Sequence, residues 1–265
     1  MKNVALSWFS GGITSAVACY WAVKTFKKVE VVFLDTKNNE HPDTYRFLKD
    51  CERLYKQKII TISNDKYNNI QDVWRKYKSL NTAHGAICST ELKRAMREKY
   101  QDLDKHYCQV FGFEYLKSQM KRHNNMRRNY PEINVVSPLI DLKINKEDSR
   151  RFIQDKGIKI PEPYLLGYEN NNCYKTGCVQ GGCGYWGMIK KREPEKFNAM
   201  ADLEHELTEA KGQPVTICKD QSGKEHKLIF LKHNPNYPNV KDISTIKGRQ
   251  PEPLMECFGF CNTLK

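Results

Sequence analysis

A glycine pair that separates an apolar run from a helix-like segment is the feature that most constrains this chain. Residues 4–9 (VALSWF) are almost all apolar, Ser10-Gly11-Gly12 ends the run, and small or apolar residues with helical spacing resume at once. A strand that is covered on both faces needs such a continuous apolar run. We therefore predict a buried strand, a tight turn and a helix that runs from Ser15 to about Lys28.

The composition of this turn is typical of an anion site. Glycines allow backbone N–H groups to approach a phosphate closely, and the N-terminus of the following helix adds a favourable dipole. The hydroxyls of Ser10 and Ser15 can donate hydrogen bonds to the same anion. No Gly-Lys-Ser or Gly-Lys-Thr follows, so the segment is not a Walker A loop. The simpler alternative is a strand-to-helix turn that binds nothing.

The alternation of strand-like and helix-like segments continues along the chain. Further strands are expected at 29–35, 58–63, 106–113 and 133–139. Between them we expect one helix that opens at 41–43 and continues through Leu54, and another at 70–80. Strands that alternate with helices predict an α/β fold with a doubly wound parallel sheet, which is Rossmann-like. Ligands of such a sheet bind beyond the carboxyl ends of its strands, where the glycine turn would lie.

The second half of the chain is less regular. We predict a nucleotide-binding domain over 1–160 and a small cysteine-rich C-terminal module over 161–265. Asn145, with Asp148 three residues on, favours a capped helix just before this boundary. The segment 167–187 is too rich in Gly and Asn to predict regular structure. A helix from Pro194 and a hairpin around 219–223 complete the module.

Composition limits the partners. The formal net charge of +13 and the pI near 9.2 favour anionic partners, either nucleotides or nucleic acid such as tRNA or DNA, although a lysine-rich solvated surface would give the same charge. No apolar run approaches the roughly 20 residues that span a bilayer, and the N-terminus does not read as a signal peptide. We therefore expect a cytoplasmic protein with no membrane contact.

Cysteine usage indicates metal or redox chemistry rather than structural disulfides. Of the ten cysteines, Cys173, Cys178 and Cys183 lie close together, and Cys257 and Cys261 close the chain. A soft cation gathers thiolates in this way, so zinc or a 4Fe–4S cluster is a candidate cofactor. The preferred ligand set is Cys173, Cys178, Cys257 and Cys261, and Cys183 could replace any of them. A redox-active pair or a set of reduced thiols remains open.

The segment Ser10-Gly11-Gly12-Ile13-Thr14-Ser15 resembles the SGGxDS signature of the PP-loop ATP pyrophosphatases and the related phosphoadenosine phosphosulfate (PAPS) reductases. This superfamily is that of the adenine nucleotide alpha hydrolase-like proteins, and the match is to the branch found in phage and bacterial genomes. The resemblance implies that the whole segment, Thr14 included, binds the phosphates of ATP or PAPS and that chemistry occurs at the α-phosphate. Thr14 stands where the family has an aspartate that assists magnesium or phosphate positioning, which puts magnesium and ATP hydrolysis in doubt.

Three further segments extend the resemblance to about 1–140. In VVFLDTKNNEHPDTYRFL, it implies that Asp35 and Thr36 border the adenosine. In GAICSTELKRAMREKY, it places Cys88, Thr90 and Lys93 near the anion.

The third segment, VFGFEYLKSQMKRHNN, resembles the loop after the fourth strand, where Gly112 opens the backbone. Glu114 stands where the family often has arginine, so Lys121 and Arg122 would supply the positive charge. Lys93 and Arg122 are the residues expected to stabilise developing negative charge.

Three functions follow as hypotheses. The first is ATP-dependent adenylation of an acceptor with release of pyrophosphate, for sulfur transfer to a nucleic acid base or a small molecule. The second is reduction of PAPS or adenylyl sulfate, with Cys257 as nucleophile and a thioredoxin-like reductant. The third is a non-catalytic, zinc-stabilised nucleic acid-binding protein, since residues 115–130 interleave basic side chains with tyrosines. Relatives of this kind are commonly homodimers.

Overall fold

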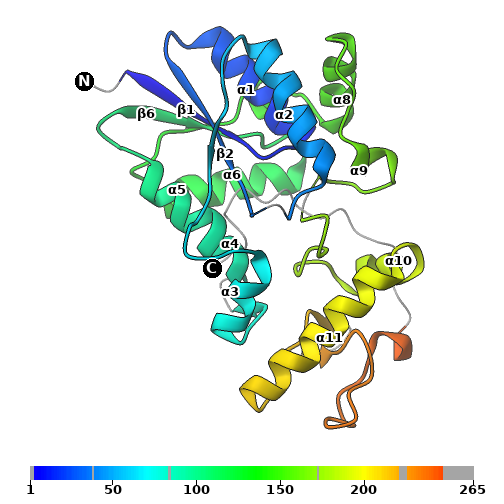
Figure 1. The fold of residues 1–265 in the computed structure, drawn as a ribbon. Coiled ribbons are helices and arrows are strands. Elements are labelled where there is room, and N and C mark those ends of the chain that lie inside the picture. The colour runs from blue at the N-terminus through cyan, green and yellow to red at the C-terminus, as the bar shows by residue number, and fades with distance from the viewer. Residues whose placement is uncertain (1–2, 38, 83–84, 172, 221–225, 247–265) are drawn as a thin grey trace.

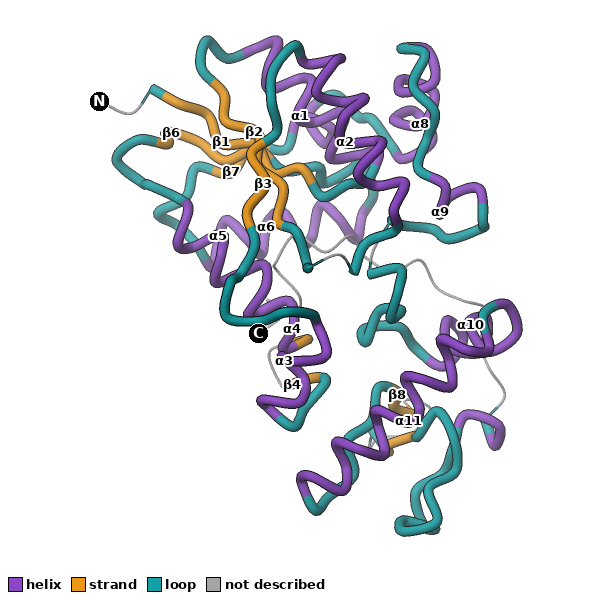
Figure 2. Tube along the Cα trace, in the orientation of Figure 1, coloured by secondary structure: helices purple, strands orange, loops and turns teal. Residues whose placement is uncertain are grey.

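The computed structural model describes residues 3–246 except 38, 83–84, 172 and 221–225. Its centre is a five-stranded sheet in the order β3-β2-β1-β6-β7, in which all neighbouring strands are parallel (Figure 2). The strands are β1 (Val4–Phe9), β2 (Val29–Leu34), β3 (Ile60–Ile62), β6 (His106–Val110) and β7 (Val135–Val136). The predicted doubly wound parallel sheet is confirmed.

Helices cover both faces of this sheet (Figure 1). One face carries α1 (Ile13–Thr25), α2 (Pro42–Tyr55) and α8 (Lys146–Asp155), and the other carries α5 (Ala95–Tyr100) and α6 (Lys117–Asn129). The remaining described elements are α3 (Ile70–Tyr77), β4 (Asn81–Thr82), β5 (Gly85–Ala86), α4 (Ile87–Ser89), the π-helical segment η1 (Thr90–Arg94), α7 (Pro138–Asp141), α9 (Glu162–Leu165), α10 (Cys183–Arg192), α11 (Pro194–Lys211), β8 (Cys218–Asp220), β9 (Lys227–Ile229) and the 3-10 helix η2 (Ile243–Thr245). In the described part of the chain, none of the helices combines the length and the apolar character needed to cross a membrane.

Strand β1 is apolar except at Ser7, because both of its faces are covered. Ala5 and Phe9 pack in the cluster under α1 and α2, where the ring of Phe9 stacks on Phe47 with 6.0 Å between centroids. Leu6 and Trp8 belong to the cluster on the opposite face, with residues of α6. Because successive side chains point to opposite faces of the sheet, β1 contributes side chains to two hydrophobic clusters.

The strand order reverses at β1. Strands β2 and β3 lie on one side of it and β6 and β7 on the other, so β1 and β6 are neighbours although about a hundred residues separate them. Their carboxyl ends lead into the Ser10–Gly12 turn and into Gly112. This is the topological switch point, where open α/β sheets bind their ligands.

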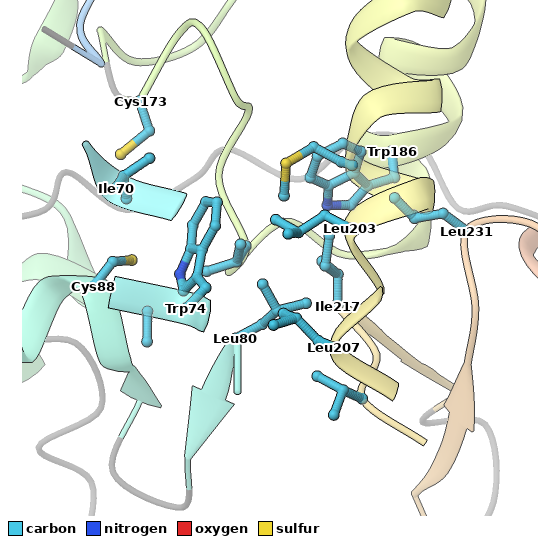
Figure 3. Packing of buried hydrophobic residues seen from close by; sticks show 14 of the residues in the cluster. Ile70, Trp74, Leu80, Cys88, Cys173, Trp186, Leu203, Leu207, Ile217 and Leu231 are labelled. Carbon is cyan, nitrogen blue, oxygen red and sulfur yellow. The ribbon is translucent and has the colours of Figure 1, made fainter. Parts of the chain in front are cut away.

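The C-terminal part shares a hydrophobic cluster with α3 and the chain that follows it. Trp186 of α10 and Leu207 of α11 belong to the same buried cluster as Trp74 and Leu80 (Figure 3). Residues from both sides of position 160 therefore contribute to one core. The division into domains at 160/161 stays a prediction.

Helix α10 differs from the irregular structure expected over 167–187. The glycine-rich stretch ends at Gly182, which is the N-cap, and the helix begins at Cys183. Trp186 and Ile189 are fully buried on one side of it. Tertiary packing of this short apolar face stabilises a helix whose glycines would not favour one locally. The predicted hairpin is confirmed, because β8 and β9 pair antiparallel.

A buried carboxyl attaches this hairpin region to α11. Both oxygens of Glu204 accept a backbone N–H, Oε1 from Ile217 and Oε2 from Leu231, each at 2.6 Å. Burial raises the pKa of Glu204 to about 8, while the two N–H bonds lower it less. Glu204 therefore holds its proton in the folded protein over a pH range where an exposed glutamate has lost it.

We expect stability to fall with rising pH because of this group. Folding raises the pKa of Glu204 from 4.5 to about 8. The stabilisation of the folded state by this protonated group is therefore fully present below pH about 4.5 and is lost as the pH rises through about 8. The loss is on the order of a few kcal/mol of unfolding free energy. In Glu204→Gln, urea denaturation should show a smaller decline over this range than in the wild type. Exposed Glu209→Gln is the control, and equal slopes in all three proteins would contradict the prediction.

Candidate functional site

The turn after β1 is a network of serine hydroxyls around a helix N-terminus. Ser15 Oγ accepts hydrogen bonds from the backbone N–H and the hydroxyl of Ser10, at 3.0 and 2.9 Å, and donates to the carbonyl of Gly12 at 2.8 Å. Ser10 is half-buried, whereas Gly12, Thr14 and Ser15 are buried. The first helical N–H of α1, that of Ile13, donates to Tyr164 Oη at 3.3 Å. The arrangement combines hydroxyls, a helix dipole and closely packed backbone, as phosphate binding requires.

Two glycines make this geometry possible. Gly11 has a φ of +83°, and a Cβ there would lie 2.7 Å from Thr44 Cγ2. A Cβ at Gly112 would lie 2.6 Å from Ser15 Cα and 2.7 Å from the Ser15 nitrogen. The chain after β6 therefore packs directly on the backbone at the start of α1. The family resemblance singled out Gly112 in the loop after the fourth strand. In the structure, the absence of a side chain at Gly112 allows this loop to lie directly against the backbone of Ser15.

Asp35 and Thr36, the residues predicted to border the adenosine, come directly after β2. Asp35 is half-buried and accepts a hydrogen bond from Tyr45 Oη at 2.9 Å. Thr36 is buried and its hydroxyl donates to Glu40 Oε1 at 2.8 Å. Both residues follow β2 at the carboxyl edge of the sheet. Their role beside the adenosine stays a prediction.

Lys93 belongs to a buried ion pair rather than to a solvated helix face. It lies in the π-helical segment η1, and its Nζ is 3.9 Å from Glu40 Oε1, with the two side chains 7% and 1% exposed. Irregular helical turns of this kind are often found at functional sites. Glu40, which sequence reasoning did not single out, thus connects Lys93 to Thr36. Its only sequence signal was a carboxylate in the loop after a buried strand.

The Gly/Asn-rich segment contributes a residue that the sequence did not identify as part of the site. Asn171 Nδ2 donates to the carbonyl of Gly11 at 2.9 Å, and its amide also hydrogen-bonds the hydroxyl of Thr44. Asn39 and Thr176 make a second contact between this segment and the loop after β2, at 3.0 Å. A run of three asparagines carries no signal that one of them holds the glycine turn.

The basic residues after β6 form part of α6. Arg122 is half-buried, with its guanidinium 5.3 Å from the centroid of the Phe113 ring, and Nη1 donates to Gln119 at 2.9 Å. Lys121 and Lys117 are exposed. The structure thus places Arg122 against the loop that begins at Gly112, and leaves the neighbouring lysines at the surface.

Three described cysteines, Cys88, Cys173 and Cys218, belong to one buried cluster, and Cys183 packs against it. Cys88 and Cys173 are shown in Figure 3, and burial raises the pKa of the Cys173 thiol, with Glu40 adding to the effect and Lys93 opposing it. The Cys218 thiol lowers the pKa of Cys183 to about 7. All eight cysteines within the described residues are free.

A metal centre does not follow from these positions. Nowhere in the described ranges do three or more His, Cys, Asp or Glu side chains form a group suited to a metal ion. The described cysteines alone therefore do not fit zinc or a 4Fe–4S cluster. Cys257 and Cys261 lie outside the described residues, so the four-cysteine ligand set stays a prediction and no chemical step is derived from it.

Comparison with known proteins identifies the family. The family model of the phosphoadenosine phosphosulfate reductase domain matches residues 4–180. None of the curated proteins compared matches the chain.

Two solved structures share part of the fold at low identity. A phosphoadenylyl-sulfate (PAPS) reductase from Candida auris in a phosphate complex is 16% identical, with a TM-score of 0.47 over 63% of this chain and 79% of that one. The U34-tRNA thiolase NcsA from Methanococcus maripaludis with its 4Fe-4S cluster is 15% identical, with a TM-score of 0.37 over 78% of this chain and 72% of that one.

Proposed function

The chain belongs to the phosphoadenosine phosphosulfate reductase domain family, and we propose that it binds ATP and transfers the adenylyl group to an acceptor with release of pyrophosphate. The observation that carries this proposal is the turn in which Ser10 and Ser15 surround the N-terminus of α1 at the switch point of the sheet. Asp35 and Thr36, at the end of the neighbouring strand β2, would border the adenosine.

The chemistry of the turn favours reaction at the α-phosphate. The turn itself contains no lysine. Backbone N–H groups, hydroxyls and a helix dipole can hold a terminal diphosphate as a leaving group without the cation that γ-phosphoryl transfer uses. In this proposal Arg122 and Lys93 stabilise the charge that develops on the departing pyrophosphate.

The acceptor in this proposal is a nucleic acid, tRNA or DNA, in which a base oxygen is adenylated. A sulfur nucleophile at the oxidation level of sulfide then attacks the same base carbon, forms the C–S bond and displaces that oxygen as part of AMP. Helix α6 follows the loop that contains Gly112 and exposes Lys117, Lys121, Arg127 and Arg128. Tyr115 and Leu116, at its N-terminal end, are 42% and 52% exposed. Exposed cations with an exposed ring beside them suit a phosphate backbone and an unstacked base.

Equilibrium binding of ATP and of PAPS tests the nucleotide site. We expect ATP to bind more tightly, and Ser15→Ala to weaken it by more than about tenfold, because several hydrogen bonds of the turn share that oxygen. Ser149→Ala is the matched control, since Ser149 is a buried helical serine of α8 whose hydroxyl bonds only a local carbonyl, that of Asn145. Turnover of ATP to AMP and pyrophosphate should then require added RNA or DNA.

Other outcomes would change the assignment. Turnover to ADP would contradict adenylation, and binding of neither nucleotide would mean that the turn is structural. Preference for PAPS would favour reduction of PAPS or adenylyl sulfate, which the matching reductase domain model supports. That reaction would release sulfite with a thioredoxin-like reductant and would be lost in Cys257→Ser.

A further inference from the structure

A side chain that lies 160 residues further along the chain holds the carbonyl of Gly11. Asn171 Nδ2 donates to this carbonyl at 2.9 Å, and Asn171 is only 2% exposed. A carbonyl oxygen only accepts hydrogen bonds, so the Asn171 atom that faces it must be the amide nitrogen. Thr44, in the first turn of α2, contacts the same amide, with its hydroxyl 2.9 Å from Nδ2 and 3.2 Å from Oδ1. The Asn171 side chain is therefore fixed in one orientation against the glycine turn.

The peptide bond between Gly11 and Gly12 needs such a contact to fix its orientation. Neither residue carries a Cβ, so rotation of this peptide plane meets little steric resistance. The peptide is planar and trans, and its C=O and N–H groups point in opposite directions. Since Asn171 holds the oxygen, the N–H of Gly12 points away from Asn171 and Thr44.

We propose that Asn171 is a positioning residue, which holds the Gly11 carbonyl so that the N–H of Gly12 donates to the phosphates of the nucleotide. The inference rests on the proposed function, in which the turn of Ser10–Gly12 binds these phosphates. If the peptide plane rotated, the Gly11 oxygen would face the anion in place of a hydrogen-bond donor. The contact with Asn171 therefore decides whether this peptide attracts or repels a phosphate.

Further contacts hold the neighbouring residues on the loop after β2. Asn39 Nδ2 donates to Thr176 Oγ1 at 3.0 Å, and the carbonyl of Asn39 accepts the N–H of Lys175 at 3.1 Å. The ring of Tyr174 packs edge-on against that of His41, with 4.4 Å between the centroids. The contact with the glycine turn is thus one of several that attach this part of the chain to the edge of the sheet.

The test titrates the full-length protein with inorganic pyrophosphate and with ATP, and follows the backbone amide resonances of the turn by NMR. In the wild type, the Gly12 amide resonance should shift as the ligand binds. Asn171→Leu keeps a similar side-chain shape and adds no charge, but it cannot donate to the Gly11 carbonyl. We expect this variant to bind pyrophosphate more than about tenfold more weakly and to lose the Gly12 shift.

Asn170→Leu is the matched control. Asn170 is also buried, but its Oδ1 accepts from Lys146 Nζ and not from the turn. This variant should bind pyrophosphate like the wild type. Thr44→Val removes the hydroxyl that orients the Asn171 amide and keeps the side-chain shape. It should weaken binding less than Asn171→Leu does, and it provides the test if Asn171→Leu fails to fold.

The possible failures of the two proposals are distinct. Wild-type affinity in folded Asn171→Leu would overturn this inference and leave the proposed function in place. An equal loss in Asn170→Leu would do the same, and so would wild-type shifts at Thr14 and Ser15 without one at Gly12. If neither pyrophosphate nor ATP shifted any amide resonance of the turn, the proposed nucleotide site would be wrong, and this inference with it.

Discussion

Gly112→Ala is expected to abolish nucleotide binding while leaving the central sheet in place. The added methyl group would lie 2.6 Å from Ser15 Cα and 2.7 Å from the Ser15 nitrogen. Both are backbone atoms of α1, so no side-chain rotation relieves the contact, and the chain after β6 has to move away from the serine turn. Overpacking of this kind costs about 1–3 kcal/mol of unfolding free energy. The displaced turn should lose ATP affinity by more than about a hundredfold.

We would measure the same protein by circular dichroism, urea denaturation and ATP titration. These measurements separate the loss of stability from the loss of ATP affinity. Gly187→Ala is the matched control, because a Cβ at that helical position meets nothing within 4 Å. That variant should bind ATP like the wild type and be slightly more stable, since alanine favours helix over glycine. Wild-type affinity in Gly112→Ala would show that the contact with α1 does not shape the site.

Lys93→Met should destabilise the protein by about 3–5 kcal/mol, the usual cost of breaking a buried ion pair. Lys93 and Glu40 are 7% and 1% exposed, so loss of the ammonium group leaves a carboxylate in a site with little water. The measurement is urea denaturation at neutral pH.

The double variant Lys93→Met/Glu40→Gln separates a structural from a nucleotide-binding role. Removal of both charges should restore most of the lost stability, and the amide oxygen of glutamine can still accept the Thr36 hydroxyl. If the stable double variant has lost ATP affinity, the charge of Lys93 acts on the nucleotide. Lys58→Met is the control, because that lysine pairs with Glu52 at the surface with 89% of its side chain exposed, and it should cost less than about 1 kcal/mol. An equally small cost for Lys93→Met would contradict the prediction.

The sequence alone determined the central sheet and the helices α1, α2 and α8 on one of its faces, whereas α5 and α6 on the other face were not predicted, and the segment of α6 was expected to be a loop. Strand β1 ends at Phe9, as its nearly continuous apolar run does, because burial on both faces favours apolar residues, and the buried hydroxyl of Ser7 donates a hydrogen bond to Cys19 Sγ. Helix α8 begins after Asn145 as predicted, with reciprocal side-chain bonds between Asn145 and Asp148, because a cap depends on residues three apart. The glycine turn was equally visible, since its conformation is encoded in consecutive residues.

Only the tertiary structure decided which distant residues meet. Asn171 on the carbonyl of Gly11 and Glu40 beside Lys93 are contacts between separate elements. Helix α10 itself depends on the burial of Trp186 in a core shared with α3. Local patterns record which face of an element is buried, but the partner across that face depends on how the elements pack, which is why these contacts could not be predicted.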